Sequence, residues 1–269
     1  MQDRPGKTLR RERINKLATT VDIKKLLEAG AHFGHQTSRW HPRMAPYIHS
    51  KREGSHIIDL TKTVEGLDKA LAFLSEVAGS GRQILLVSTK RQAKDKVKEV
   101  ALATNMPYVT ERWLGGMLTN QATISSQIRR VKDLENRLAT GELEARYSKL
   151  EVQRFNEEIA ALNQLYGGIK EMPAKPGAVF VVDVLTNINA VREAKKLHIP
   201  VVALVDTNVD PSLADYPIPA NDDATKTINL VLDYVQAAIE TGKGKAKRPA
   251  DKTEIEQKSD SESAAKESK

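Results

Sequence analysis

Residues 178–183 read Ala-Val-Phe-Val-Val-Asp, and this run shows best which fold the chain adopts. It is apolar at five successive positions, whereas a strand that faces water on one side alternates apolar and polar residues. Residues 83–88, Gln-Ile-Leu-Leu-Val-Ser, and residues 200–205, Pro-Val-Val-Ala-Leu-Val, have the same character. Strands buried on both faces are typical of a parallel sheet covered by helices on both sides. The three runs therefore predict the centre of such a sheet.

Helical patterns alternate with strands around these runs. Two further stretches, residues 56–60 and 106–109, also have strand character and bring the number of predicted strands to five. Apolar residues recur every three or four positions in the stretches between them, as expected of amphipathic helices. Strand–helix alternation with short connections predicts an α/β fold with a five-stranded, parallel, doubly wound sheet of the flavodoxin-like class. The predicted helices cover residues 62–77, 90–104, 189–197 and 223–240.

Residues 120–166 interrupt this alternation, because they carry two long helical patterns and no strand pattern. The second pattern repeats apolar residues at intervals of three and four, as in the seam of a coiled coil. Thr140 and Gly141 separate the two patterns. We therefore predict an antiparallel coiled-coil helical hairpin inserted into the α/β domain, and we expect a protruding hairpin to contact a partner. The seam consists of Val152, Phe155, Ile159, Leu162 and Tyr166.

The composition fits a globular protein of one or two domains, since 40% of the 269 residues are hydrophobic and 29% are charged. No apolar run approaches the roughly 18–20 residues that cross a membrane. The N-terminus lacks the apolar segment of a secretory signal. The absence of cysteine excludes disulfides and thiolate metal sites, so nothing indicates an oxidising compartment. We predict a cytoplasmic protein that does not contact membranes.

The net charge of +7 and the isoelectric point of about 9.4 indicate an anionic partner. The charge lies mainly at the ends: residues 1–19 hold six Lys or Arg and two acids, and residues 242–269 hold eight and six. Residues 20–241 hold 28 and 27 and are nearly neutral. We interpret residues 1–19 as a basic arm, residues 20–241 as the α/β domain and residues 242–269 as a disordered, charged tail. The arm either orders on a partner or remains a solvated tail.

Residues 30–52, GAHFGHQTSRWHPRMAPYIHSKR, have no steady hydrophobic period and predict neither a helix nor a strand. A short helix is predicted just before them, over residues 21–29, with its apolar side facing inward. The segment 30–52 is nevertheless rich in cations and flat rings, and five of the six histidines lie in it or just beyond it. The side chains expected to face inward from the short helix are those of Ile23, Leu26 and Leu27.

Flat rings interleaved with guanidinium groups suit the base stacking and phosphate contacts of RNA recognition. The segment 30–52 therefore predicts an RNA-binding surface. Alternatively, Phe33, Trp40 and Tyr47 pack the segment on the core, and its composition has no further role. The residues predicted to contact RNA are Arg39, Trp40, His41, Arg43, Lys51 and Arg52.

Sequence motifs for phosphate binding and nucleophilic catalysis are absent. No strand is followed by Gly-x-Gly-x-x-Gly, and neither a P-loop nor a nucleophile-elbow motif occurs. Asp183 and Asp206 do end two predicted strands, where the ligands of doubly wound folds bind. The two carboxylates keep open a rival interpretation, an α/β enzyme or nucleotide-binding protein that uses both. Alternatively, they cap helices or hold turns.

A metal site is the remaining chemical alternative. His32 and His35 are three residues apart and His41 is near, so two or three imidazoles could meet at one ion. Outside a regular helix or strand, however, this spacing is not diagnostic. Histidines beside arginines in a loop more often contact RNA or backbone groups. We therefore predict no metal, no cofactor and no small-molecule substrate.

Four segments carry a family signature. They are residues 30–45 (GAHFGHQTSRWHPRMA), 111–121 (ERWLGGMLTNQ), 167–174 (GGIKEMPA) and 202–224 (VALVDTNVDPSLADYPIPANDDA). Together they resemble the bacterial small-subunit ribosomal protein two (S-two) family, over about residues 20–241. The resemblance implies an α/β domain with a protruding coiled-coil hairpin and no catalytic activity. It also implies binding to small-subunit ribosomal RNA and to neighbouring ribosomal proteins, including ribosomal protein one.

The resemblance places functional residues by position. Residues 39–43 fall in the first motif, and Arg112 and Trp113 fall in the second, which adds Arg112 to the predicted RNA-binding residues. The chain also departs from the family pattern. The basic arm before Thr20 is longer than usual, and residues 184–190 lack the acidic and histidine residues expected after Asp183. The departures leave the family resemblance intact but weaken any argument for a metal near Asp183.

Overall fold

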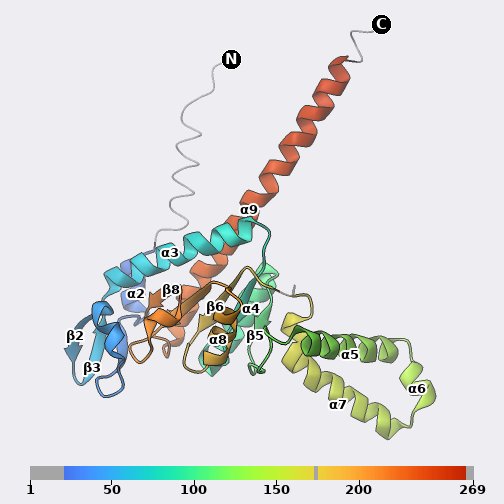
Figure 1. Ribbon diagram of the computed structural model, residues 1–269, viewed down its shortest axis with the longest axis horizontal. Helices are drawn as coiled ribbons and strands as arrows, with labels where there is room; N and C mark the ends of the chain where they lie inside the picture. Colours follow the sequence, from blue (N-terminus) through green and yellow to red (C-terminus); the bar gives the residue numbers. More distant parts are fainter. Residues whose placement is uncertain (1–20, 173–174, 265–269) are drawn as a thin grey trace.

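The computed structural model describes residues 21–172 and 175–264, with side chains described up to residue 244. Its centre is a sheet of five parallel strands: β4 (Ile84–Val87), β5 (Tyr108–Val109), β6 (Ala178–Val182), β7 (Val201–Val205) and β8 (Tyr216–Pro219). The spatial order is β5-β4-β6-β7-β8 (Figure 1). Numbered along the chain, this order is 2-1-3-4-5, the order of flavodoxin-like sheets. The predicted fold class is confirmed.

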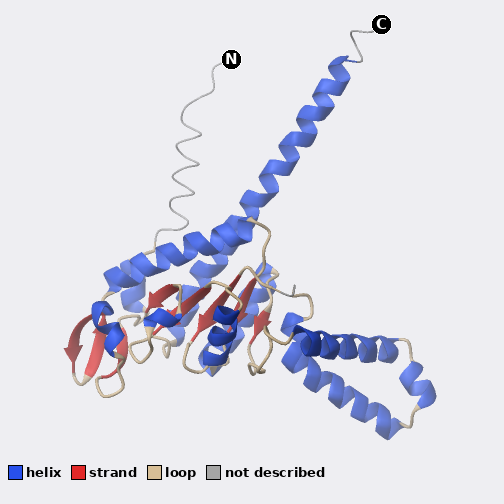
Figure 2. Cartoon of the chain, in the orientation of Figure 1, coloured by secondary structure: helices blue, strands red, loops and turns tan. Residues whose placement is uncertain are grey.

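Helices cover both faces of this sheet (Figure 2). They are α2 (Ile23–Glu28), α3 (Leu60–Gly79), α4 (Arg91–Thr104), α8 (Ile188–Lys196) and α9 (Thr225–Ala264). Every residue of β4, β6 and β7 is buried, and alternate side chains enter two separate cores. One core includes residues of α2, α3, α4 and α9, and the other includes residues of α8. This two-sided burial explains the continuous apolar runs of the central strands.

The fifth strand of the sheet is not the predicted one. The sequence predicts residues 56–60 as a strand of the parallel sheet, and that assignment is wrong, because β8 takes the edge position next to β7. Pro217 and Pro219 in β8 argue against a strand when the sequence is read alone. An edge strand tolerates proline because one of its sides needs no hydrogen-bond donors.

Residues 33–58 form a second, antiparallel sheet in the order β1-β3-β2. Its elements are β1 (Phe33–Gln36), the 3-10 helix η1 (Pro42–Tyr47), β2 (Ile48–Arg52) and β3 (Ser55–Ile58). The prediction that residues 30–52 contain no strand is therefore wrong. Register shifts interrupt both pairings, and most β2 side chains are exposed, so no hydrophobic period marks these strands. Glu53 and Gly54, with φ of 50° and 80°, make the tight turn between β2 and β3.

The short helix α2 is confirmed, and Asp22 caps it by accepting a hydrogen bond from the Lys24 N–H (2.9 Å). Of the three side chains predicted to face inward, only Leu26 is fully buried. Ile23 is 46% exposed and Leu27 is 53% exposed, so that part of the prediction is wrong. A helix of six residues places only one side on the core, and Leu26 occupies it.

The last helix is longer than predicted. The sequence predicts its end near residue 240, whereas α9 continues to Ala264. The disordered tail assigned to residues 242–269 stays a prediction, and residues 265–269 lie outside the described part of the chain. The basic arm, residues 1–19, lies outside it as well. Among the described residues, no helix is both long and apolar enough to cross a membrane.

Residues 121–166 leave the sheet along α5 (Gln121–Ala139), turn through α6 (Glu142–Arg146) and return along α7 (Lys149–Tyr166). Figure 1 shows α5 and α7 side by side, projecting away from the sheet. Arg130 on α5 pairs with Glu158 on α7 (2.5 Å), and Val131, Leu134 and Ile159 are buried. After α7 the chain passes into the 3-10 helix η2 (Gly167–Ile169), which packs on β5, so the insertion does not disturb the strand order.

Candidate nucleic-acid interface

Thr207, at the end of β7, makes two of the hydrogen bonds that fix the small sheet to the parallel sheet. The His41 N–H donates to the Thr207 carbonyl oxygen (2.8 Å), and the His35 N–H donates to Thr207 Oγ1 (2.9 Å). A Cβ added at Gly34 would lie 2.6 Å from Thr207 Cγ2, so only glycine allows this approach. The segment predicted to bind RNA is therefore anchored at the carboxyl edge of the parallel sheet.

The cations of this segment differ in how they are engaged. Arg39 is exposed and forms no ion pair with any described residue. Arg43 donates through Nη1 to Asp210 Oδ2 (2.6 Å) and to Ser212 Oγ (3.0 Å), yet its side chain stays 65% exposed. Among the residues that the structure describes, Arg52 pairs only with Glu53, at 3.9 Å, and both side chains are more than four-fifths exposed. Arg39 and Arg52 are thus free to contact an external anion, and Arg43 is oriented but accessible.

The sequence leaves two roles open for Trp40, contact with RNA and packing on the protein. Its ring packs on the ring of His56, with centroids 5.1 Å apart, and Lys51 Nζ lies 5.9 Å from the indole centroid. His56 is completely buried, and neither ring nitrogen has a hydrogen-bond partner in the described structure. Burial, and next the charge of Lys51, lower the pKa of His56, so the ring is neutral. Trp40 therefore packs the loop between β1 and η1 on β3, and its ring is partly covered.

His41 has a local structural role. It is the N-cap residue of η1, and its Nδ1 accepts a hydrogen bond from the Arg43 N–H (3.3 Å). The cap fixes the turn that orients the side chain of Arg43. His41 is half-buried, so it remains near the surface that Arg39 and Arg43 share.

The second predicted motif lies elsewhere on the same edge of the sheet. Arg112 follows β5, whereas Thr207 follows β7, three strand positions away. Three strand spacings correspond to about 14 Å. Arg112 is exposed and, within the described residues, has no ion-pair or hydrogen-bond partner. Trp113 is 8% exposed and belongs to the second core.

Glu193 on α8 holds the loop that follows Arg112, and sequence reasoning misses it. Its Oε1 accepts from Trp113 Nε1 (3.0 Å) and the Gly116 N–H (2.8 Å), and its Oε2 accepts from the Leu118 N–H (3.0 Å) and from Thr119. Burial alone would raise the pKa of Glu193, but these hydrogen bonds outweigh it and keep the pKa below its ordinary value. In the sequence, Glu193 resembles any polar residue of an amphipathic helix, so this role cannot be recognised there.

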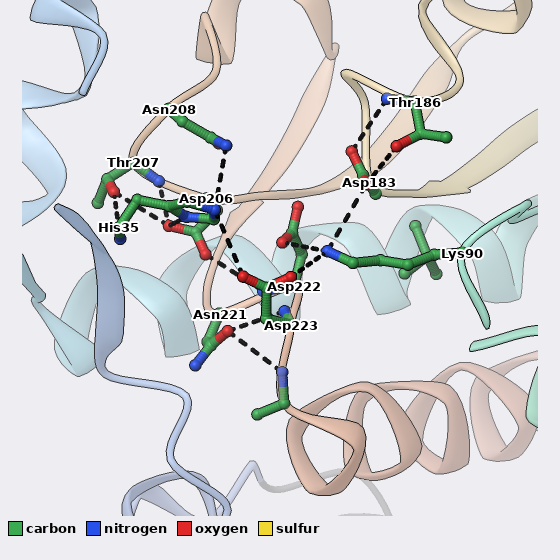
Figure 3. A network of polar contacts seen from close by, with 12 residues as sticks. His35, Lys90, Asp183, Thr186, Asp206, Thr207, Asn208, Asn221, Asp222 and Asp223 are labelled. Atoms are coloured by element: carbon green, nitrogen blue, oxygen red, sulfur yellow. Dashed lines mark hydrogen bonds and ion pairs between the residues drawn. The ribbon is translucent and has the colours of Figure 1, made fainter. Parts of the chain in front are cut away.

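A second polar cluster fills the crevice between β4 and β6 (Figure 3). This is the switch point of the strand order, where doubly wound folds bind their ligands. Lys90 Nζ lies 2.7 Å from Asp222 Oδ1, 2.6 Å from Asp223 Oδ1 and 3.6 Å from Asp183 Oδ2. Thr89 and Asn187 close the same crevice with a 3.2 Å hydrogen bond. The chain's own side chains therefore occupy this place.

His35 joins the cluster to the small sheet. Its Nδ1 lies 3.1 Å from Asp206 Oδ1, and its Nε2 lies 3.4 Å from Asp223 Oδ2 (Figure 3). The hydrogen bond with Asp206 raises the pKa of His35 despite its burial. Burial, and next the charge of Asp206, raise the pKa of Asp222 to about 7. The carboxylates outnumber the two cations, Lys90 and His35, so the cluster repels a phosphate.

His35, Asp206 and Asp222 are also the residues best placed for a metal in the described part of the chain. They can offer three ligand atoms that lie within 4.8 Å of one another. The sequence grouping of His32, His35 and His41 is not found: the ring of His32 packs at a tilt on that of Phe33, and His41 caps η1. Lys90 Nζ already lies 2.7 Å from Asp222 Oδ1, so the cluster contains a positive charge without a metal ion. The absence of a metal stays a prediction.

Comparison with known proteins identifies the family. The chain is 49% identical over 221 residues to the small ribosomal subunit protein uS2 of Roseiflexus sp., covering 82% of this chain and 84% of that protein. It is 49% identical over 227 residues to the protein of the same name from Chloroflexus aggregans, covering 84% and 95%. Residues 26–242 match the family described as ribosomal protein S2. This chain belongs to the ribosomal protein S2 family.

Proposed function

We propose that the protein is a structural constituent of the small ribosomal subunit that binds ribosomal RNA and has no enzymatic activity. Membership of the ribosomal protein S2 family supports this function. The observation that carries it is that Arg39 and Arg112 are exposed, without partners among the described residues, on segments that are themselves anchored. An anchored, uncompensated guanidinium group is suited to a phosphate, because it meets the anion without giving up an internal ion pair.

The RNA-binding surface consists of the segment 30–52 and of Arg112. Arg39, Arg43 and Arg112 supply bidentate contacts to phosphate oxygens. Lys51 and Arg52, exposed on β2, extend the positive surface along the small sheet. Trp40 and His41 stabilise the segment that carries these cations.

Two parts of the chain supply contacts with partners. The hairpin α5–α7 and the basic arm contact RNA or neighbouring proteins of the small subunit, among them ribosomal protein one. The protein works on ribosomes in the cytoplasm and takes no small-molecule substrate. Replacing residues 130–155 by a short Gly/Ser linker tests the hairpin: the sheet domain stays folded, while incorporation into subunits falls. Global unfolding, or incorporation at the level of the full chain, would contradict this role.

The rival interpretation, a nucleotide-binding α/β protein that uses Asp183 and Asp206, is disfavoured by the crevice itself. Asp183 accepts hydrogen bonds from Thr186, and Asp206 accepts from Thr207 and faces His35, so both carboxylates are engaged internally. Titration calorimetry with millimolar ATP, GTP and NAD separates the two interpretations. We expect no saturable heat with any nucleotide.

The direct test of the proposed function is cosedimentation. We expect the tagged full chain to sediment with intact small subunits from a cell lysate and to leave them at high salt. A protein that remains at the top of the gradient at low salt would contradict the proposed function.

A further inference from the structure

We propose that Glu193 is a positioning residue for RNA binding: the loop that its carboxylate clamps, residues 113–119, fixes Arg112 toward an RNA phosphate. The inference rests on the proposed function, because Arg112 has no role here without RNA. It concerns a residue on α8 that lies outside the RNA-binding surface and outside all four sequence motifs.

The clamp is unusually complete for a single side chain. Both oxygens of Glu193 are used, and the donors are an indole N–H, three backbone N–H groups and the Thr119 hydroxyl. Hydrogen bonds to a charged acceptor are about twice as strong as those between neutral groups. The backbone N–H groups converge on the carboxylate as they would on a bound anion. The loop is therefore closed around an internal anion and does not itself receive a phosphate.

The loop has one anchored side and one open side. Met117 and Leu118 are buried in the second core, and Gly116 adopts φ of +88°, which favours glycine. Arg112 and Gly115 point outward, and no atom lies within 4 Å of where a Gly115 Cβ would be. Such a loop presents the residues of its open side in a fixed geometry.

Arg112 depends on this clamp because it directly precedes Trp113, the first residue that Glu193 holds. Loss of the carboxylate charge weakens the acceptor for the Gly116, Leu118 and Thr119 N–H groups, so the turn loosens. The contacts of Glu193 with Thr119 hold the other end of the loop, next to Asn120, the N-cap residue of α5. Glu193 thus fixes both ends of the loop that follows Arg112.

The experiment measures the affinity of the full chain for small-subunit ribosomal RNA at several salt concentrations. Three variants are compared with the unmodified chain: Arg112→Gln, Glu193→Gln and the double variant. Glu76→Gln, an exposed glutamate on α3, is the matched control for loss of a negative charge. A loss of charge by itself favours RNA binding, so Glu76→Gln should bind equally well or slightly more tightly.

We expect Arg112→Gln to weaken binding about tenfold and to reduce the slope of log affinity against log salt by about 0.7–0.9. Glu193→Gln should weaken binding severalfold, although the loss of a negative charge by itself would strengthen it. The double variant should bind no more weakly than Arg112→Gln alone, because the two residues act through one contact. Penalties that add in the double variant, or unchanged binding of Glu193→Gln, would overturn the inference.

The loop itself gives a second readout. In a Trp40→Phe background, Trp113 is the sole tryptophan, and Glu193→Gln should shift its emission to longer wavelength and increase its quenching by acrylamide. If Glu193→Gln does not fold, Glu193→Asp keeps the charge and is expected to retain part of the affinity. RNA binding no weaker in a folded Glu193→Asp than in the unmodified chain would contradict the inference. Failure of the unmodified chain to bind RNA would overturn the proposed function and this inference together, whereas additive penalties overturn this inference alone.

Discussion

The switch-point crevice and the small sheet treat charge in opposite ways. In the crevice, the side chain of Lys90 is 15% exposed and lies close to three carboxylates, so its charge is compensated inside the protein. On the small sheet, Arg39 has no partner among the described residues and Arg52 meets only an exposed acid at 3.9 Å. Basic side chains are thus paired with acids of the protein in the crevice, whereas on the small sheet they remain available to an external anion.

The comparison teaches where function lies in this fold. A doubly wound sheet offers its switch point to ligands, yet here that point is filled by a lysine–aspartate cluster that supports the structure. The exposed cations that we propose to bind RNA lie instead on the added sheet and on the loop after β5. If this division is correct, changes in the crevice alter stability, and changes on the small sheet alter RNA binding.

The largest expected effect is that of Lys90→Met. Removing the ammonium group leaves Asp222, whose side chain is 3% exposed, without its counterion, and breaking a buried pair costs about 3–5 kcal/mol. Urea unfolding followed by circular dichroism measures the change. The control is Lys62→Met, which removes an exposed pair with Glu65 and should cost less than about 1 kcal/mol. Equal losses for the two variants would contradict an internal role of Lys90.

Trp40→Ala should have the next largest effect. The indole packs on His56 and is half-buried, so we expect a loss of about 2 kcal/mol of stability and faster proteolysis within residues 30–52. Trp40→Phe retains a ring and is expected to recover most of the loss. Weaker RNA binding with unchanged melting temperature would instead show that the indole stacks on a base.

The pH dependence of stability is a smaller effect, and its sign follows from Asp222. Its pKa is raised to about 7 in the folded state, so between its unfolded pKa and pH 7 the folded state binds more protons than the unfolded state. Stability therefore falls as pH rises through this window, by about 1 kcal/mol between pH 6 and pH 8. The raised pKa of His35 acts in the same direction. Chemical denaturation at pH 6 and pH 8 measures this change in stability. In the control, Asp222→Asn, the stability should depend less on pH.

The smallest expected effect is that of metal removal. Because Lys90 already pairs with three carboxylates of the cluster, we expect less than one equivalent of zinc after dialysis and no change of melting temperature with EDTA. Metal analysis and thermal unfolding measure both. One ion per chain that is lost on His35→Ala would show that His35, Asp206 and Asp222 hold a cation and that the crevice is not closed by protein groups alone.

Sequence reasoning predicts the central strands because β6 and β7 are buried on both faces and therefore apolar throughout. It fails at β8 because this edge strand contains prolines, which argue against a strand in the sequence. It fails at β1 and β2 because register shifts and exposed side chains remove the alternation of apolar and polar residues. The RNA-binding surface stays a prediction: composition marks a segment rich in cations and rings, but it does not distinguish Arg39 from Arg43, which pairs with Asp210. Lys90 and Glu193 are not predictable, because their partners are more than 70 residues away in sequence.

The central claim is that cations of the small sheet bind ribosomal RNA through phosphates. The most direct measurement is the affinity of Arg39→Gln/Arg43→Gln for a small-subunit ribosomal RNA fragment across salt concentrations. Each lost phosphate contact removes roughly 0.7–0.9 from the slope of log affinity against log salt, so we expect the slope to flatten by about 1.5. The variant should keep its fold, since both side chains are exposed. An unchanged slope in the folded double variant would contradict the claim.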